Sequence, residues 1–203
     1  MTTFIKRAEK QKISEQRAAA IRLKNNRLGM NIFQVSWIMA FVALIVVNWQ
    51  LRFNYSQWPP AGVPPFDLVL PSVATLALLI SSAQIALGLK ALRRGIAKAF
   101  LARWRLAIGL GALFMAIIVY EFLNVSDAAM ATQYGNTFRL MAGFHFVHAL
   151  AILAIMCRVY LGANQGRYLG GEHDSWAVEG AAKLWYFVTF AWMLFYLVLY
   201  WIR

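Results

Sequence analysis

The sequence has one cysteine, only eight acidic residues against 20 Lys and Arg, and few ionisable residues inside its apolar runs. The single Cys157 excludes a disulfide within the chain and any cysteine-rich metal site, and we expect it to be a small apolar filler. Catalytic signatures such as H-E-x-x-H, a phosphate-binding glycine loop or a nucleophile elbow are absent. We therefore assign no catalytic residue.

Apolar residues are abundant: they make up 61% of the 203 positions, against roughly 45–50% in a soluble domain. A membrane-spanning helix needs about 20 mostly apolar residues. Five stretches qualify, and they leave no room for a soluble domain of any size. The sequence predicts an all-α integral membrane bundle over residues 31–203, with spans at about 31–51, 68–89, 105–124, 139–161 and 183–202.

The net charge of +12 is distributed as topology requires, not as a nucleic-acid site would be. Eight of the 20 Lys and Arg precede the first span, six lie between spans two and three, and three lie between spans four and five. The other side keeps three: Arg52, Arg139 and Arg203. The positive-inside rule then predicts a cytoplasmic N-terminus, a periplasmic C-terminus and no nucleic-acid partner.

Residues 1–30 form a basic tail of mostly good helix formers. The first apolar run is of full membrane length and has no small-residue cleavage site after it, so we do not expect a cleavable signal. We predict a helix on or near the membrane surface, close to anionic headgroups, and a partly disordered tail is the alternative.

Apart from basic residues at or near their predicted cytoplasmic ends, the spans hold four charged or imidazole side chains: Glu121, Arg139, His145 and His148. Ionisable groups inside a membrane are costly and are functional candidates by default. Counted from the predicted outer ends of spans three and four, Glu121 and His145 differ in depth by about 5 Å. Because these two spans are joined by a short loop, we hypothesise a Glu121–His145 hydrogen bond or ion pair.

The histidine pair is a poor match to a metal or heme site. His145 and His148 share one helix face, whereas axial heme ligands come from opposite sides of the porphyrin. A carboxylate-bridged di-metal bundle needs Glu-x-x-His pairs on two helices and further glutamates, and only one acid lies within the spans. We expect no metal or cofactor on this chain and interpret both histidines as polar contacts between helices.

Other polar and small residues have ordinary structural interpretations. Ser81, Ser82, Gln84 and the G-L-G-A segment at 109–112 suit close helix packing. The W-P-P-A-G-V-P-P-F segment at 58–66 predicts a rigid interfacial turn, with a docking surface as the alternative. An acid that stands just before the last span, Glu179, suits the positive end of a helix dipole.

Three blocks of sequence point to one family. The outer loop has W-P-P-A-G, residues 134–148 read Y-G-N-T-F-R-L-M-A-G-F-H-F-V-H, and residues 179–201 run from E-G-A-A-K-L-W to L-Y-W. Together they resemble subunit III of the heme-copper terminal oxidases, in the short five-helix form of bacteria. The resemblance covers about residues 27–203, and these positions carry it: Trp58, Pro59, Pro60, Glu121, Gly143, Phe144, His145, His148, Glu179 and Trp185.

The chain departs from the family pattern in two places. The family's H-F-V-D in the last helix reads Tyr186-Phe187-Val188-Thr189 here. The buried glutamate that the family carries in the first shared helix corresponds to Trp37, after Ser36. Roles proposed for that acid in proton uptake or lipid binding would then not apply.

The resemblance implies a non-catalytic, cofactor-free subunit of a proton-pumping oxidase in a bacterial inner membrane. It would pack on subunit I, with subunit II and a small subunit IV or a supercomplex as further partners, and heme and copper would lie in subunits I and II. Phospholipids would bind between its helices, and Arg158 matches a position that meets lipid headgroups, with a plain topological charge as the alternative. The choice of cytochrome c or quinol as donor belongs to other subunits. The competing interpretations are a stand-alone transporter, a quinone-binding membrane protein and an accessory protein of a nitric-oxide reductase system.

Overall fold

The computed structural model describes residues 2–168 and 176–202. Its elements are α1 (Thr2–Arg52), α2 (Val69–Arg93), α3 (Ala97–Leu123), the short α4 (Asp127–Met130), α5 (Gln133–Asn164), α6 (Trp176–Tyr196) and a π-helical turn, η1 (Leu197–Trp201). No strand occurs in the described part of the chain. Five of the helices are long and apolar enough to cross a membrane, which confirms the predicted all-α class and the five spans.

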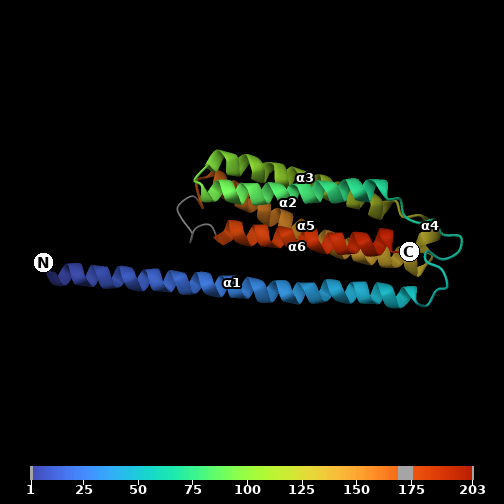
Figure 1. Ribbon diagram of the computed structural model, residues 1–203, viewed down its shortest axis with the longest axis horizontal. Helices are drawn as coiled ribbons and strands as arrows, with labels where there is room; N and C mark the ends of the chain where they lie inside the picture. The colour runs from blue at the N-terminus through green and yellow to red at the C-terminus, as the bar shows by residue number, and fades with distance from the viewer. Residues whose placement is uncertain (1, 169–175, 203) are drawn as a thin grey trace.

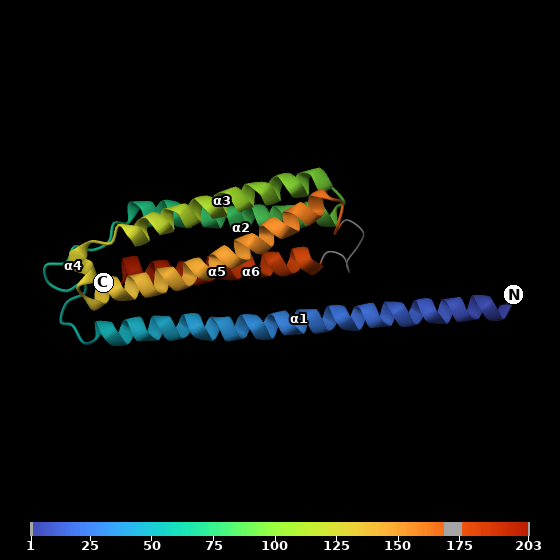
Figure 2. The ribbon, with the colours of Figure 1, turned by 180° about the vertical axis from the view of Figure 1, so that it is seen from behind.

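The helices lie side by side in three layers (Figures 1 and 2). α2 and α3 form a tight antiparallel hairpin, α5 and α6 lie next to them, and α1 lies on the far side against α6 and α5. α6 is central, because it contacts α2, α5 and α1. Its span is accordingly the most buried of the five, whereas that of α1 is almost entirely exposed.

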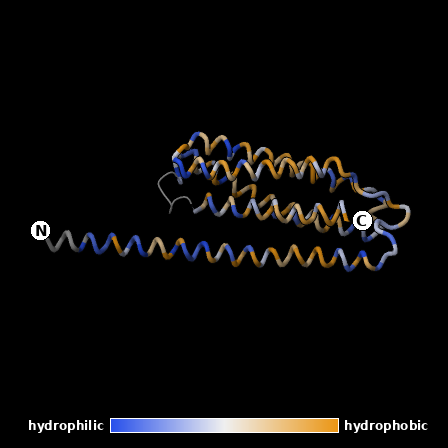
Figure 3. The backbone as a smooth tube through the Cα atoms, in the orientation of Figure 1, coloured by the Kyte–Doolittle hydropathy of each residue, from blue (hydrophilic) through white to orange (hydrophobic). Residues whose placement is uncertain are grey.

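α1 is much longer than its predicted span. It runs for 51 residues without a break, which corresponds to about 76 Å. Its basic N-terminal part continues straight beyond the other helices, and this part is the more hydrophilic half of the helix (Figure 3). The predicted tail is thus helical, but it continues the axis of the first span instead of starting a separate element.

The proline-rich segment packs over the start of α5. The Tyr134 ring stacks on Phe66 with centroids 4.5 Å apart and meets Trp58 edge-on at 5.3 Å. The Phe66 backbone N–H donates to the Tyr134 hydroxyl at 3.1 Å. These contacts fix the loop between α1 and α2 at the end of the molecule that also holds α4 and η1 (Figure 1).

Candidate functional site

His145 lies in the centre of the bundle and is fully buried among aromatic rings. Its ring contacts Trp192 at a centroid distance of 5.4 Å and Phe41 and Phe114 at 5.9 Å each. Neither ring nitrogen has a hydrogen-bond partner. The imidazole therefore fills space between α1, α3, α5 and α6 as an aromatic ring would, and it forms no polar contact between helices.

His148 lies one turn further along α5 and faces α1. Its Nδ1–H donates to the Phe144 carbonyl oxygen at 2.6 Å. The ring packs edge-on against Trp37 at 4.6 Å. Trp37, which stands where the family pattern suggests a buried acid, thus contributes an aromatic contact between α1 and α5.

The hypothesised Glu121–His145 contact is wrong. Phe114 is the α3 side chain that lies beside His145, and Glu121 follows it by seven residues, or about 10 Å along the helix axis. Glu121 lines a small pocket of about 220 Å³ with Pro64 and Asp67 at the loop end of the bundle. The depth estimate failed because α5 begins at Gln133, six residues before the predicted span.

Arg139 forms a cation–π contact with Phe122. Its guanidinium lies over the Phe122 ring, 5.1 Å from the centroid. A cation over an aromatic face is stabilised by the quadrupole of the ring. This contact joins the start of α5 to the end of α3.

A ladder of side-chain hydrogen bonds joins α2 to α6. Trp185 Nε1–H donates to the Ser81 hydroxyl at 2.9 Å, and the Ser81 hydroxyl in turn donates to the Ala107 carbonyl of α3 at 2.8 Å. Further along the same two helices, Trp192 Nε1–H donates to the Thr75 hydroxyl at 2.9 Å. The hydroxyls of Ser82 and Thr189 lie 2.6 Å apart and add a third contact between the two helices. The prediction that the serines of span two serve helix packing is confirmed.

Glycine allows α3 to approach this ladder closely. A Cβ atom added at Gly111 would come within 2.7 Å of the Trp185 ring and 3.2 Å of Leu153, whereas one added at Gly109 would meet nothing within 4 Å. Of the glycines in the G-L-G-A segment, Gly111 is therefore the one that the packing requires.

Glu179 ties three helices together at the basic end. It lies in the first turn of α6, as the dipole argument expects. Its carboxylate also accepts from Arg27 of α1 at 3.3 Å and lies 3.9 Å from Arg93 of α2. Both salt bridges found among the described residues therefore run through this one acid.

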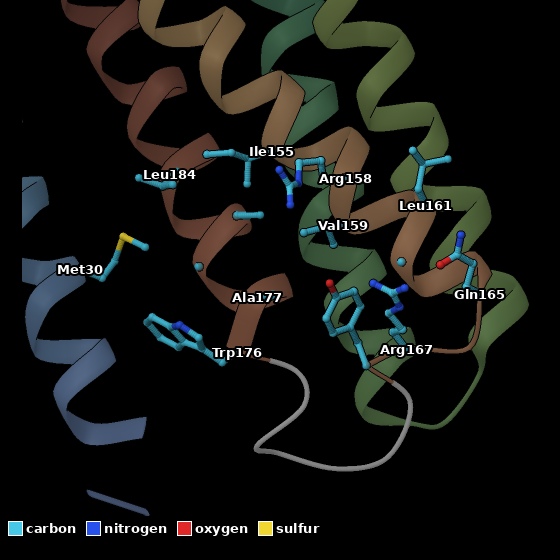
Figure 4. Close-up of a pocket in the computed structure, with 14 residues that line it drawn as sticks. Met30, Ile155, Arg158, Val159, Leu161, Gln165, Arg167, Trp176, Ala177 and Leu184 are labelled. Carbon is cyan, nitrogen blue, oxygen red and sulfur yellow. The ribbon is translucent and has the colours of Figure 1, made fainter. Parts of the chain in front are cut away.

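Next to this junction is a pocket of about 670 Å³ between α1, α5 and α6. Its walls are mostly apolar, and Arg158 and Arg167 line it from α5 and the turn that follows (Figure 4). Met30 and Trp176 line it from α1 and α6. A cavity with apolar walls and two guanidinium groups suits an anionic amphiphile, because guanidinium binds phosphate with charge-assisted hydrogen bonds.

Metal binding is not supported in the described part of the chain, where no three His, Cys, Asp or Glu side chains gather closely enough to hold an ion. The family model described as cytochrome c oxidase subunit III matches residues 8–203. The chain belongs to this family. The resemblance drawn from the sequence blocks is therefore confirmed. Membership of this family agrees with the five helices that are long and apolar enough to cross a membrane, and both point to a multi-pass membrane protein.

Relatives of this subunit III occur in distant organisms. Cytochrome c oxidase subunit 3 of Thermostichus vulcanus is 29% identical over 174 residues, which cover 85% of each chain. The Synechocystis protein of the same name is 27% identical over 174 residues, covering 85% of this chain and 73% of its own. That of Loxodonta africana is 30% identical over 181 residues, covering 86% of this chain and 69% of its own.

Sequence reasoning missed the ion-pair partners of Glu179 and most of the pocket. Arg27, Arg93 and Trp176 come from segments far apart in the chain, and no local spacing joins them. One signal was present for the α2–α6 ladder. Trp185 and Trp192 are seven residues apart, as are Thr75 and Ser82, which places each pair on one helix face.

Proposed function

We propose that this chain is the accessory, non-catalytic subunit III of a proton-pumping heme-copper oxidase in a bacterial inner membrane. The match to the subunit III family model over residues 8–203 carries this proposal. In it, the chain packs on subunit I and stabilises it, while heme and copper lie in subunits I and II. Subunit II, a small subunit IV or a supercomplex would supply further contacts.

The interior of the bundle supports an accessory role. Trp104, Trp185, Trp192 and several phenylalanine rings are fully buried and fill the space between the helices. Serine and threonine hydroxyls in the interior bond to neighbouring helices. A transporter needs a polar path or broken helices at mid-membrane, and the packed aromatic interior resembles neither.

The apolar surface of the described part of the chain suits contact with lipid and with partner subunits. Large apolar side chains such as Val73, Leu76, Leu106, Val147 and Phe190 are about half exposed or more along the spans. Since lipid tails and apolar protein faces both match such surfaces, the bundle can meet partner helices and lipid over most of its circumference.

The cytoplasmic side is proposed to be the basic end. The N-terminal part of α1, the α2–α3 turn and the start of α6 gather there (Figure 1). These segments hold most of the Lys and Arg of the chain. The positive-inside rule assigns such an end to the cytoplasm.

The pocket at this end is proposed to bind an anionic phospholipid, with its phosphate between Arg158 and Arg167 and its chains along the apolar wall. Native mass spectrometry of the purified complex tests this proposal. The Arg158→Gln/Arg167→Gln variant should lose a bound anionic lipid, whereas the Arg105→Gln control, whose exposed side chain lies outside the pocket, should retain it. Equal lipid retention in both variants would refute the site.

Affinity purification from native membranes tests the proposed function. A tag on this chain should recover the heme-bearing subunit I and subunit II in mild detergent, as identified by mass spectrometry. Recovery of a nitric-oxide reductase core would assign the chain to that system. Failure to recover any core subunit, combined with flux in liposomes that hold this chain alone, would favour a transporter.

A further inference from the structure

One exposed side of α1 carries an apolar stripe along its membrane-spanning part. Leu28, Val35, Val42 and Trp49 recur every seven residues and are 41–60% exposed. Phe41 and Asn48, which directly precede Val42 and Trp49 and therefore lie about 100° around the helix from them, are buried against the bundle. The two faces are distinct, and only one of them is covered.

Three cations continue the same stripe beyond the bundle. Lys10, Arg17 and Lys24 are exposed and also recur every seven residues, and Lys24 precedes Leu28 by four. On a straight helix, seven residues turn the chain by about −20° and four by about +40°. All seven side chains of the two sets, which we term the outer stripe of α1, therefore leave the helix within about 60° of one another.

The acids of this segment lie off the stripe. Glu15 is two residues from Arg17, and its carboxylate accepts from Gln11 at 3.2 Å. Glu9 is likewise out of the seven-residue register. No ion pair to Lys10, Arg17 or Lys24 is found among the described residues. The cationic part of the outer stripe is thus uncompensated from within the chain.

A lipid leaflet does not match the length of this stripe. Lys10 and Lys24 are 14 residues apart, which places them about 21 Å apart along the axis. The polar region of each leaflet is only about 5–8 Å thick, and spanning helices tilt by about 20° on average. Headgroups would meet Lys24, while Arg17 and Lys10 would stand beyond them in water.

A second copy of the chain does not match either. A parallel copy on the same face would set Lys10, Arg17 and Lys24 against the same cations, and like charges that face one another repel. A matching partner would present an apolar surface to the membrane part of the stripe and negative charge to its aqueous, cationic part.

We propose that the outer stripe of α1 is an interface for a membrane-spanning helix of a different polypeptide, which continues out of the bilayer alongside α1 as an acidic segment. Apolar side chains of that helix pack on Leu28, Val35, Val42 and Trp49, and carboxylates at about seven-residue spacing pair with Lys10, Arg17 and Lys24. This interface is independent of the proposed function: a purification without an oxidase core would leave it standing.

Site-specific photo-crosslinking in native membranes tests the interface. A benzophenone amino acid at Val35 of the full chain should capture a polypeptide that has a membrane span followed, on the same side as the α1 extension, by an acidic segment. The Lys10→Glu/Arg17→Glu/Lys24→Glu variant should lower this capture by about tenfold, because three attractive pairs become repulsive. Capture by the unchanged chain should also weaken as salt is raised.

A matched control separates the stripe from bulk charge. The Arg7→Glu/Lys12→Glu/Arg22→Glu variant changes the net charge by the same amount but leaves the stripe intact, so its capture should equal that of the unchanged chain. Equal membrane levels of both variants show that both insert. Adducts with lipid alone, adducts with a second copy, or equal loss of capture in the two variants would overturn the proposal.

Discussion

The two histidines of the G-F-H-F-V-H segment differ in what surrounds them. His148 donates to a backbone carbonyl, whereas both nitrogens of His145 are enclosed by aromatic rings without a partner. An enclosed polar group without a partner costs about 1–3 kcal/mol, and its replacement by an apolar group of similar shape is close to neutral or stabilising. His145 therefore contributes volume and ring contacts rather than a hydrogen bond.

This leads to a prediction for His145→Leu. The variant should melt at or above the temperature of the unchanged chain in detergent, as followed by circular dichroism. Trp192→Leu, as a contrast in the same cluster, should destabilise by roughly 3 kcal/mol, because it loses a large buried ring and the bond to Thr75. A large loss of stability in His145→Leu would mean that the imidazole has a polar partner after all.

The two glycines of α3 make a matched pair. Gly111→Ala should destabilise by about 1–3 kcal/mol, because its Cβ would collide with the Trp185 ring. Gly109→Ala should be neutral or stabilising by up to about 1 kcal/mol, because alanine favours the helix and the added Cβ meets nothing. Unfolding titrations in SDS measure both. The packing account would fail if the two variants had the same stability.

Among the elements, α1 is the one most loosely held. Its contacts with the bundle include the Glu179–Arg27 pair, a Gln34 side-chain bond to the Lys183 carbonyl at 3.2 Å and the aromatic contacts of Trp37 and Phe41. At the other end Arg52 donates to the Ile202 carbonyl at 2.8 Å. Since these contacts are spread thinly over a long helix, each matters more than it would in the packed core.

Glu179→Gln should loosen the basic end of α1. The amide removes both ion pairs, each of which is exposed enough to contribute only about 0.2–1 kcal/mol. Global stability should thus change little, while the distance distribution between spin labels at Asn25 and Leu161, in a Cys157→Ala background, should broaden. Glu15→Gln is the control and should leave the distribution unchanged. An unchanged distribution in Glu179→Gln would show that the pairs do not hold α1.

At the same scale, the limits of prediction from the sequence have physical causes. The five spans and the family were predicted correctly, because length, hydropathy and compact motifs are local properties. α1 extends far beyond its apolar run, since charged helix formers continue a helix into water. α5 begins six residues before its apolar run, in the polar but uncharged segment 133–138, and this shifted the depth that the Glu121–His145 hypothesis needed. Of the pocket, only Arg158 was indicated beforehand, by the resemblance; Arg167 and Met30 were not, because segments far apart in sequence assemble it.

For the whole molecule, the concentration of Lys and Arg at one end is the main feature that sets its orientation in a membrane. Thiol labelling tests the proposed orientation in a Cys157→Ala background. Asn25→Cys should react with an impermeant reagent only in inverted vesicles, and Ser56→Cys, in the loop at the opposite end, only in right-side-out vesicles. The reverse pattern would place the basic end outside and contradict the topology.

The central claim is that this subunit III assembles with redox-active partners and holds no redox centre of its own. The most direct measurement is a reduced-minus-oxidised optical spectrum with a copper and iron count, taken on the complex purified through this chain and on the chain expressed alone. The account predicts heme bands and copper in the complex and neither on the isolated chain. Stoichiometric heme or copper on the isolated chain, or a natively purified sample without either, would contradict it.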